Sequence, residues 1–205
     1  QQFGFVHDTE VGKSGFITAL YIVFVPIISL FLGRRGSPLL WAAVALSLVG
    51  LWFLCIPPEG FTIAAGDLFV LACAVVFSLH ILVIGRYVLL VDAVELSMMQ
   101  FFCGSILAFF AMLALESPTW IGWQTALPAM LWAGIMSNGI AYTLQIVGQR
   151  GMNDTTSSLI LSLESVFSVI SGWLILNEVL SVREGLGCVL MAAAVVLAQL
   201  PGNKK

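Results

Sequence analysis

Seven long apolar runs occupy most of this chain and limit what it can fold into. Each approaches the ~20 residues that an α-helix needs to cross a hydrocarbon core about 30 Å thick. Because lipid offers no hydrogen bonds to the backbone, spanning segments must be helices or closed barrels, and runs this long favour helices. We therefore predict an all-α polytopic membrane helix bundle with seven transmembrane helices, at about residues 14–32, 39–56, 67–89, 94–115, 126–149, 155–176 and 185–200.

The composition supports a membrane setting and excludes several other classes. Hydrophobic residues make up 60% of the chain and charged residues 9%, whereas a soluble domain has about 45–50% and about 25%. The few basic residues form no stripe for nucleic acid. The four cysteines lie inside predicted spans without metal-ligand spacing, so we interpret them as packing residues and expect no metal and no cofactor.

Basic residues in the short loops predict the orientation, because cytoplasmic loops are enriched in Lys and Arg. If the spans alternate in direction, the loops on the outer side of the membrane hold only two basic residues, Lys13 and Arg183. The predicted location is a cell membrane, inner or plasma, with several passes and a cytoplasmic C-terminus. The basic residues on the cytoplasmic side are Arg34, Arg35, Arg86, Arg150, Lys204 and Lys205.

Two parts of the chain resemble each other, residues 13–50 and residues 156–195. Tyr21 aligns with Glu164, and Ser37 aligns with Ser181 at almost the same offset. The first span of each pair would cross the membrane in the opposite direction. This pattern indicates an inverted-topology repeat, which is typical of secondary transporters.

The repeat also predicts how the chain is divided. Residues 1–62 would be the C-terminal part of a first repeat, with two spans, and residues 63–205 a complete second repeat of five spans. Three further spans would then precede this chain. The complete protein is expected to be a ten-helix, five-plus-five bundle.

Four segments carry a resemblance to a known family: GKSGFITALYIVFVPIISLFLGRR, GDLFVLACAVVFSLHILVIGRY, IAYTLQIVGQR and LILSLESVFSVISGWLILNEVLS. In this order they closely resemble the EamA-like transporters of the drug/metabolite transporter superfamily, with the N-terminal part missing. The resemblance implies ten spans, a central cavity that opens alternately to each side, and export or uptake of small metabolites. The family often has Glu-Pro at Glu164–Ser165 and Gly-Glu at Asn177–Glu178, so we expect a less kinked helix at Glu164.

Glu164 lies near the middle of its predicted span, where a carboxylate costs about 2.5–3.5 kcal/mol to insert. Ser157, Ser168 and Ser171 recur at helical spacing from it, so the carboxylate would lie on a polar stripe. One interpretation is a cavity-facing group that binds a cationic or amine-bearing substrate, or exchanges a proton with it. The alternative is a structural hydrogen bond from a protonated Glu164 to a neighbouring helix.

The preceding span has a second polar stripe, formed by Asn138, Tyr142, Gln145 and Gln149. Amides and a phenol donate and accept hydrogen bonds without net charge, which suits recognition of a polar metabolite. The alternative is contact between helices, worth about 0.6 kcal/mol per hydrogen bond. We expect Gln149, at the end of the stripe, to be the most interfacial of the four.

Three further positions complete the candidate site. His80 lies alone in its span and is either a packing residue or a proton relay with Glu164. Thr18 and Tyr21 mirror the Glu164 stripe through the repeat, while Pro26 marks a hinge or a tolerated kink. The predicted substrate-binding residues are Glu164, Asn138, Tyr142, Gln145, Tyr21, Thr18 and Ser168.

These features predict a secondary active transporter, not an enzyme. It would move an amino acid, an amine or a similar small polar compound by alternating access, with proton coupling as one option. Two alternatives remain: a non-transporting membrane scaffold, and an intramembrane enzyme, which would need a paired catalytic constellation. The expected partners are the substrate and the lipid bilayer, with the protein as a monomer or a homodimer.

Overall fold

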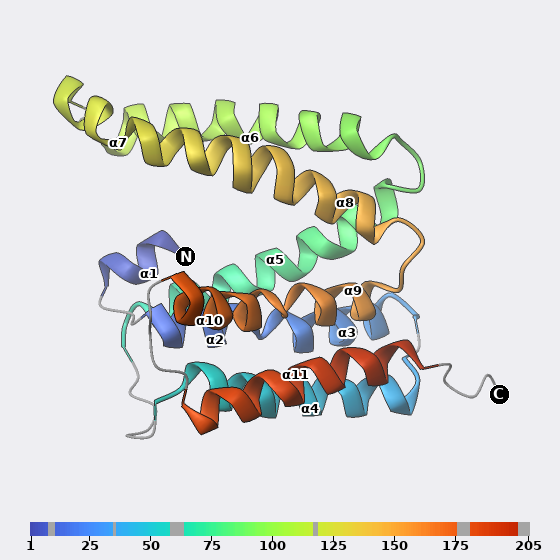
Figure 1. The fold of residues 1–205 in the computed structure, drawn as a ribbon. Helices are drawn as coiled ribbons and strands as arrows, with labels where there is room; N and C mark the ends of the chain where they lie inside the picture. Colours follow the sequence, from blue (N-terminus) through green and yellow to red (C-terminus); the bar gives the residue numbers. More distant parts are fainter. Residues whose placement is uncertain (8–10, 35, 58–63, 117–118, 176–180, 201–205) are drawn as a thin grey trace. The chain divides into compact units, whose positions relative to one another are not determined.

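The computed structural model describes residues 1–7, 11–34, 36–57, 64–116, 119–175 and 181–200 (Figure 1). These residues form helices with no strand among them, which confirms the predicted all-α membrane bundle. Arg35, Lys204 and Lys205 from the charge count, and Asn177–Glu178, lie outside the described residues. The helices are α1 (Gln2–Val6), α2 (Val11–Ala19), α3 (Tyr21–Phe31), α4 (Pro38–Cys55), α5 (Asp67–Tyr87), α6 (Ala93–Leu115), α7 (Trp120–Trp132), the π-helix η1 (Ala133–Tyr142), α8 (Thr143–Gln149), α9 (Asp154–Leu161), α10 (Glu164–Ile175) and α11 (Val182–Gln199).

Six helical segments among the described residues are long and apolar enough to cross a membrane. The seventh predicted run, residues 126–149, is also helical, but it passes from α7 through η1 into α8. The six are Lys13–Phe31, Pro38–Cys55, Asp67–Tyr87, Ala93–Leu115, Asp154–Ile175 and Val182–Gln199.

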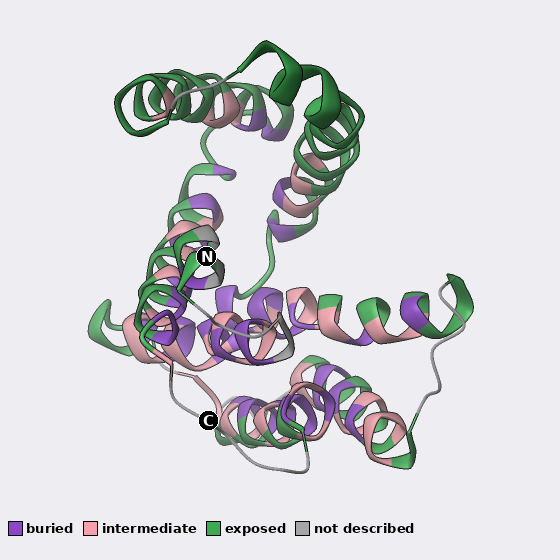
Figure 2. Cartoon of the chain, turned by 90° about the vertical axis from the view of Figure 1, so that its left-hand side faces the viewer, coloured by how far each residue is buried: buried purple, intermediate pink, exposed green. Residues whose placement is uncertain are grey.

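The chain divides into two compact units. Unit 1 contains residues 1–82 and 153–205, and unit 2 contains residues 83–152. The core of unit 1 joins its helices through fully buried side chains, such as Ile22, Leu51 and Met191. Figure 2 shows buried residues along the faces on which these helices pack.

Two helices of unit 1, α4 and α11, begin in the same way. Ser37 and Ser181 are their N-cap residues, with φ/ψ of −70°/154° and −73°/154°, and each side-chain oxygen accepts a backbone N–H of the first turn. Ser181 also forms a capping box with Glu184. Both helices are 18 residues long. The N-cap serines therefore match in structure as they do in the sequence alignment.

The spans before these helices are both interrupted. Between α2 and α3 the break is at Leu20, with φ/ψ of −59°/−10°, and between α9 and α10 it is at Ser162 and Leu163, where Ser162 has φ/ψ of −64°/−15°. At both breaks the ladder tightens to i→i−3 hydrogen bonds, from Leu20 N–H to Ile17 O and from Leu163 N–H to Ile160 O. Such short 3₁₀ turns within a helix often mark hinges.

The second interruption lies directly before Glu164. The absence of a proline after Glu164 led us to expect a less kinked helix there, and this stays a prediction. The structure shows that α9 ends at Leu161 and that α10 begins at Glu164. The Ser162 hydroxyl donates to Leu159 O at 2.7 Å and competes with the backbone for that carbonyl. In the first copy Pro26 lies within α3, and the break precedes it at Leu20.

Unit 2 has a small core and broad exposed apolar faces. Ile84, Val88, Ala93 and Ile146 form the core, and the Ser97 and Thr143 hydroxyls are hydrogen-bonded at 2.7 Å between α6 and α8. No described residue of α7 or η1 is buried, and these helices are drawn green in Figure 2. Their side chains form an exposed and largely apolar surface of unit 2.

Candidate functional site

The structure places the predicted site residues in two groups. Unit 1 holds the pair that aligns through the repeat, Tyr21 and Glu164, together with Thr18, His80 and Ser168. Unit 2 holds Asn138, Tyr142 and Gln145. Each group is described within its own unit.

Tyr21 and Glu164 occupy equivalent places beside the two breaks. Tyr21 is the first residue of α3, and Glu164 is the first residue of α10. Interrupted spans are where many transporters build substrate and ion sites, because the irregular backbone offers polar groups at mid-membrane depth. A phenol and a carboxylate therefore lie at equivalent positions beside the two breaks of unit 1.

Glu164 itself is exposed, and its carboxylate makes no ion pair or hydrogen bond with another described residue. Ser168, one turn further along α10, is exposed as well. Ser157, predicted to share their stripe, is 4% exposed and belongs to α9, so the break divides the stripe. Glu164 and Ser168 remain together on one exposed part of α10.

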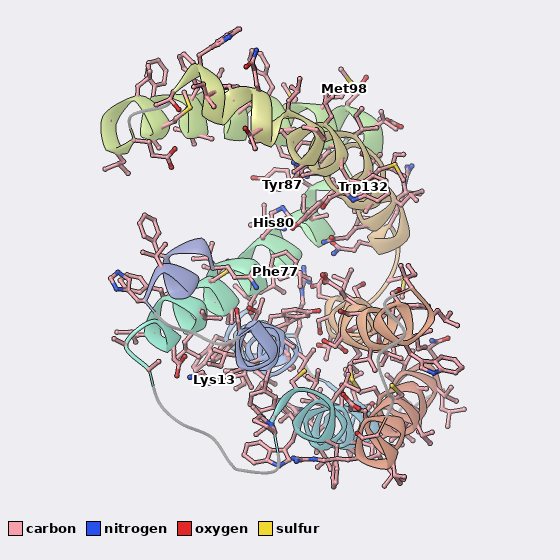
Figure 3. All side chains as sticks on the ribbon, turned by 60° about the vertical axis from the view of Figure 1, so that its left-hand side comes forward. Lys13, Phe77, His80, Tyr87, Met98 and Trp132 are labelled. Carbon is pink, nitrogen blue, oxygen red and sulfur yellow. The ribbon has the colours of Figure 1, made fainter. Side chains whose placement is uncertain are left out.

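Tyr21 lies at the end of a short row of rings. Its ring meets Phe77 edge-on with centroids 5.1 Å apart, and Phe77 stacks on His80 at 5.8 Å with an interplanar angle of 21°. Phe77 and His80 both come from α5 (Figure 3). The row thus links His80 to the break at Leu20. Thr18, on α2, accepts a hydrogen bond from the Gln1 side chain at 3.3 Å.

The polar stripe of unit 2 begins in a π-helix. Asn138 is exposed within η1, and Tyr142 at its end packs edge-on against Phe101 with centroids 5.9 Å apart. π-helical turns frequently mark functional sites, since they displace side chains from the α-helical register. The hydropathy pattern gave no sign of this change in helix type.

Two glutamines in α8 follow this segment. The Gln145 Nε2 atom is buried without a hydrogen-bond partner among the described residues, and both amide atoms of Gln149 are in the same state. Gln149 is only 4% exposed. Buried amides without partners cost about 1–3 kcal/mol each, which makes them candidates for binding a polar group.

The sequence analysis missed two ion pairs in unit 1. The Lys13 Nζ atom lies 3.1 Å from Asp67 Oδ2, and Arg34 pairs with Asp154. The signal in the sequence is their position, because all four residues lie at predicted span ends. Among the described residues, no three His, Cys, Asp or Glu side chains gather in a group that fits a metal ion.

Comparison with known proteins adds three similarities. Residues 64–200 match the EamA-like transporter family. The chain is 31% identical over 202 residues to an uncharacterized transporter of Archaeoglobus fulgidus, an alignment that covers 94% of this chain and 61% of that protein. This chain therefore spans about three fifths of the relative's length. One protein of known crystal structure superposes with a TM-score of 0.80 at 22% identity, over 98% of this chain and 72% of the other, which supports the fold alone.

Proposed function

Because this chain belongs to the EamA-like transporter family, we propose that it forms part of a secondary active transporter. The transporter moves an amino acid, an amine or a similar small polar compound across the cell membrane by alternating access. The observation that carries this proposal is the pair of interrupted spans, each with a polar residue, Tyr21 or Glu164, at its break. Discontinuous helices in inverted repeats are the usual place for transporter sites.

The proposed division into repeats, residues 1–62 and 63–205, is supported by matched local structure. The N-caps of α4 and α11 and the breaks at Leu20 and Ser162 have nearly the same backbone angles. Two repeats of opposite direction provide two structures of similar energy, with the site open to one side or the other.

Glu164 is the proposed centre of substrate recognition. Its exposed carboxylate has no counter-charge among the described residues, so a cationic or amine-bearing substrate supplies the missing partner. The proposed binding set also includes Tyr21, Thr18 and Ser168, with Asn138, Tyr142 and Gln145 from unit 2. If transport is coupled to protons, we propose that Glu164 and His80 relay them.

The proposed setting is the inner or plasma membrane, with the C-terminus in the cytoplasm, as the excess of basic residues on that side indicates. The protein acts there as a monomer or homodimer. A membrane scaffold is the second candidate, but a scaffold has no need of an unpaired carboxylate within a span.

Transport by the full-length protein in proteoliposomes tests the proposal. Wild-type protein is expected to take up labelled amines or amino acids, and Glu164→Gln is expected to weaken substrate binding by about 1.5–3 kcal/mol, the worth of a hydrogen bond to a charged group. If Glu164 instead carries the coupling proton, the same variant loses pH-dependent uphill transport while it retains exchange.

Glu116→Gln is the matched control, because Glu116 is an exposed carboxylate at the C-cap of α6, outside the proposed site. It should transport like the wild type. Wild-type affinity together with wild-type pH dependence in Glu164→Gln would leave Glu164 with a structural role only.

A further inference from the structure

Two ion pairs within unit 1 connect residues of the first proposed repeat to residues of the second. Lys13 and Arg34 belong to residues 1–62, while their partners Asp67 and Asp154 belong to residues 63–205. Within the described residues, no other ion pair is present. Each pair therefore crosses from one proposed repeat to the other.

The two pairs lie at opposite ends of one span. Lys13 begins the Lys13–Phe31 segment, and Arg34 follows its end. At 1.5 Å per residue these ends are about 28 Å apart, which is close to the thickness of the hydrocarbon core. In Figure 1 the start of α2 and the end of α3 lie at opposite ends of unit 1. Because this segment is long and apolar enough to cross a membrane, one pair would lie toward each face.

Each pair also holds the half-helix that precedes a break. Lys13 lies on α2, which ends at the Leu20 break, and Asp154 is the first residue of α9, which ends at the Ser162 break. A hinge motion at a break would move the half-helix before it. Breaking one ion pair therefore releases one half-helix at one face.

The two pairs differ in their exposure to solvent. The side chains of Lys13 and Asp67 are 4% and 10% exposed, and Asp67 also accepts the Ala64 N–H at 2.8 Å. The Arg34 side chain is 50% exposed, and it lines an open pocket together with Ser29 and Asp154. The Lys13–Asp67 pair is thus buried, whereas in the other pair solvent reaches the Arg34 side chain but not Asp154, which is 8% exposed (Lys13 is labelled in Figure 3).

We propose that these ion pairs are the alternate closures of the transport path. The Lys13–Asp67 pair closes one end, the Arg34–Asp154 pair closes the other, and one opens while the other stays formed. This inference rests on the proposed function, because alternating access requires that the repeats separate at one face at a time.

Two buried serines provide reporters for the two ends. Ser14 is fully buried beside Lys13 on α2, and Ser29 is 7% exposed beside the Arg34–Asp154 pocket. In the full-length protein with its native cysteines replaced, Ser14→Cys and Ser29→Cys are introduced singly. The protein is placed in nanodiscs without substrate, where a membrane-impermeant maleimide reaches both faces.

Removal of one charge should open one end only. Asp67→Asn is expected to raise labelling at position 14 on the order of tenfold and to leave position 29 unchanged or lower. Asp154→Asn is expected to do the reverse. Exchange of the charges, Lys13→Asp with Asp67→Lys or Arg34→Asp with Asp154→Arg, should return labelling to the starting level.

If the ion pairs only stabilise the fold, each Asn variant should raise labelling at both positions or at neither. That result would overturn the inference. If an Asn variant does not fold, a short bifunctional thiol reagent across Lys13→Cys and Asp67→Cys gives the same information. This cross-link should block labelling at position 14 and leave position 29 reactive. Equal labelling at position 14 with and without the cross-link would contradict the closure. If each Asn variant raises labelling at its own end only, but the protein transports no substrate, the closures are retained and the proposed function is refuted. If the protein transports substrate but the variants do not change labelling at one end only, the proposed function is retained and the closures are refuted.

Discussion

At Gly187, in α11, the backbone of α4 leaves no room for a side chain. A Cβ atom at this position would lie 2.8 Å from Gly50 O and 3.1 Å from the Leu54 backbone nitrogen. Both neighbours are backbone atoms of α4, so they cannot rotate away. Small residues allow this close approach of two helices in a membrane, where packing replaces the hydrophobic effect as the attraction between helices.

Gly187→Ala should therefore destabilise the protein by about 1–3 kcal/mol, the usual cost of overpacking. Thermal unfolding in detergent is expected to shift to lower temperature. Gly185→Ala on the same helix is the control, because a Cβ atom added there would meet no other atom within 4 Å. If the two variants unfold at the same temperature, the close crossing of α4 and α11 does not contribute to stability.

Residue-level pairing was the hardest feature to predict from the sequence. Arg34 and Asp154 are 120 positions apart, and nothing in either segment specifies the other as a partner. Glu164 was found because a carboxylate within an apolar run is costly wherever it lies. The ion pairs were missed because charges at span ends are common, and only the packed structure brings Lys13 to Asp67.

At the scale of elements, hydropathy predicted where the spans lie but not where they break. Length and apolar composition are properties of a segment, so they can be read without knowledge of its neighbours. The break at Ser162 is instead a local feature, at which the Ser162 hydroxyl donates a hydrogen bond to Leu159 O. The π-helix from Ala133 to Tyr142 likewise depends on backbone geometry to which hydropathy is insensitive.

Ser162→Ala tests the cause of this break. The change removes the competing hydroxyl and improves helix propensity by about 0.5 kcal/mol, so amides at Leu163 and Ser165 should exchange with solvent about twofold more slowly. Transport should slow as well, because the hinge is stiffer. Hydrogen exchange measured by mass spectrometry reports the first effect.

Ser158→Ala is the matched control for this experiment. The Ser158 hydroxyl bonds to Thr155 O in the same way, at 2.8 Å, but inside α9. Its removal should leave exchange at Leu163 unchanged. Equal effects of the two substitutions would show that the break does not depend on Ser162.

At the scale of the whole molecule, the proposed orientation in the membrane can be tested by labelling residues in exposed loops. Met152, 38% exposed, lies in a predicted cytoplasmic loop, and exposed Ala65 lies on the predicted outer side. In intact cells, an impermeant thiol reagent should label Ala65→Cys and spare Met152→Cys. The opposite pattern would reverse the proposed orientation.

The most direct measurement of the central claim is counterflow in proteoliposomes that contain the full-length protein. Vesicles loaded with unlabelled substrate should take up labelled substrate faster than empty vesicles, and the uptake should saturate, because a site that opens alternately returns faster when it is occupied. Uptake that rises linearly with concentration and is unaffected by internal substrate, or no uptake of any polar metabolite, would contradict the account.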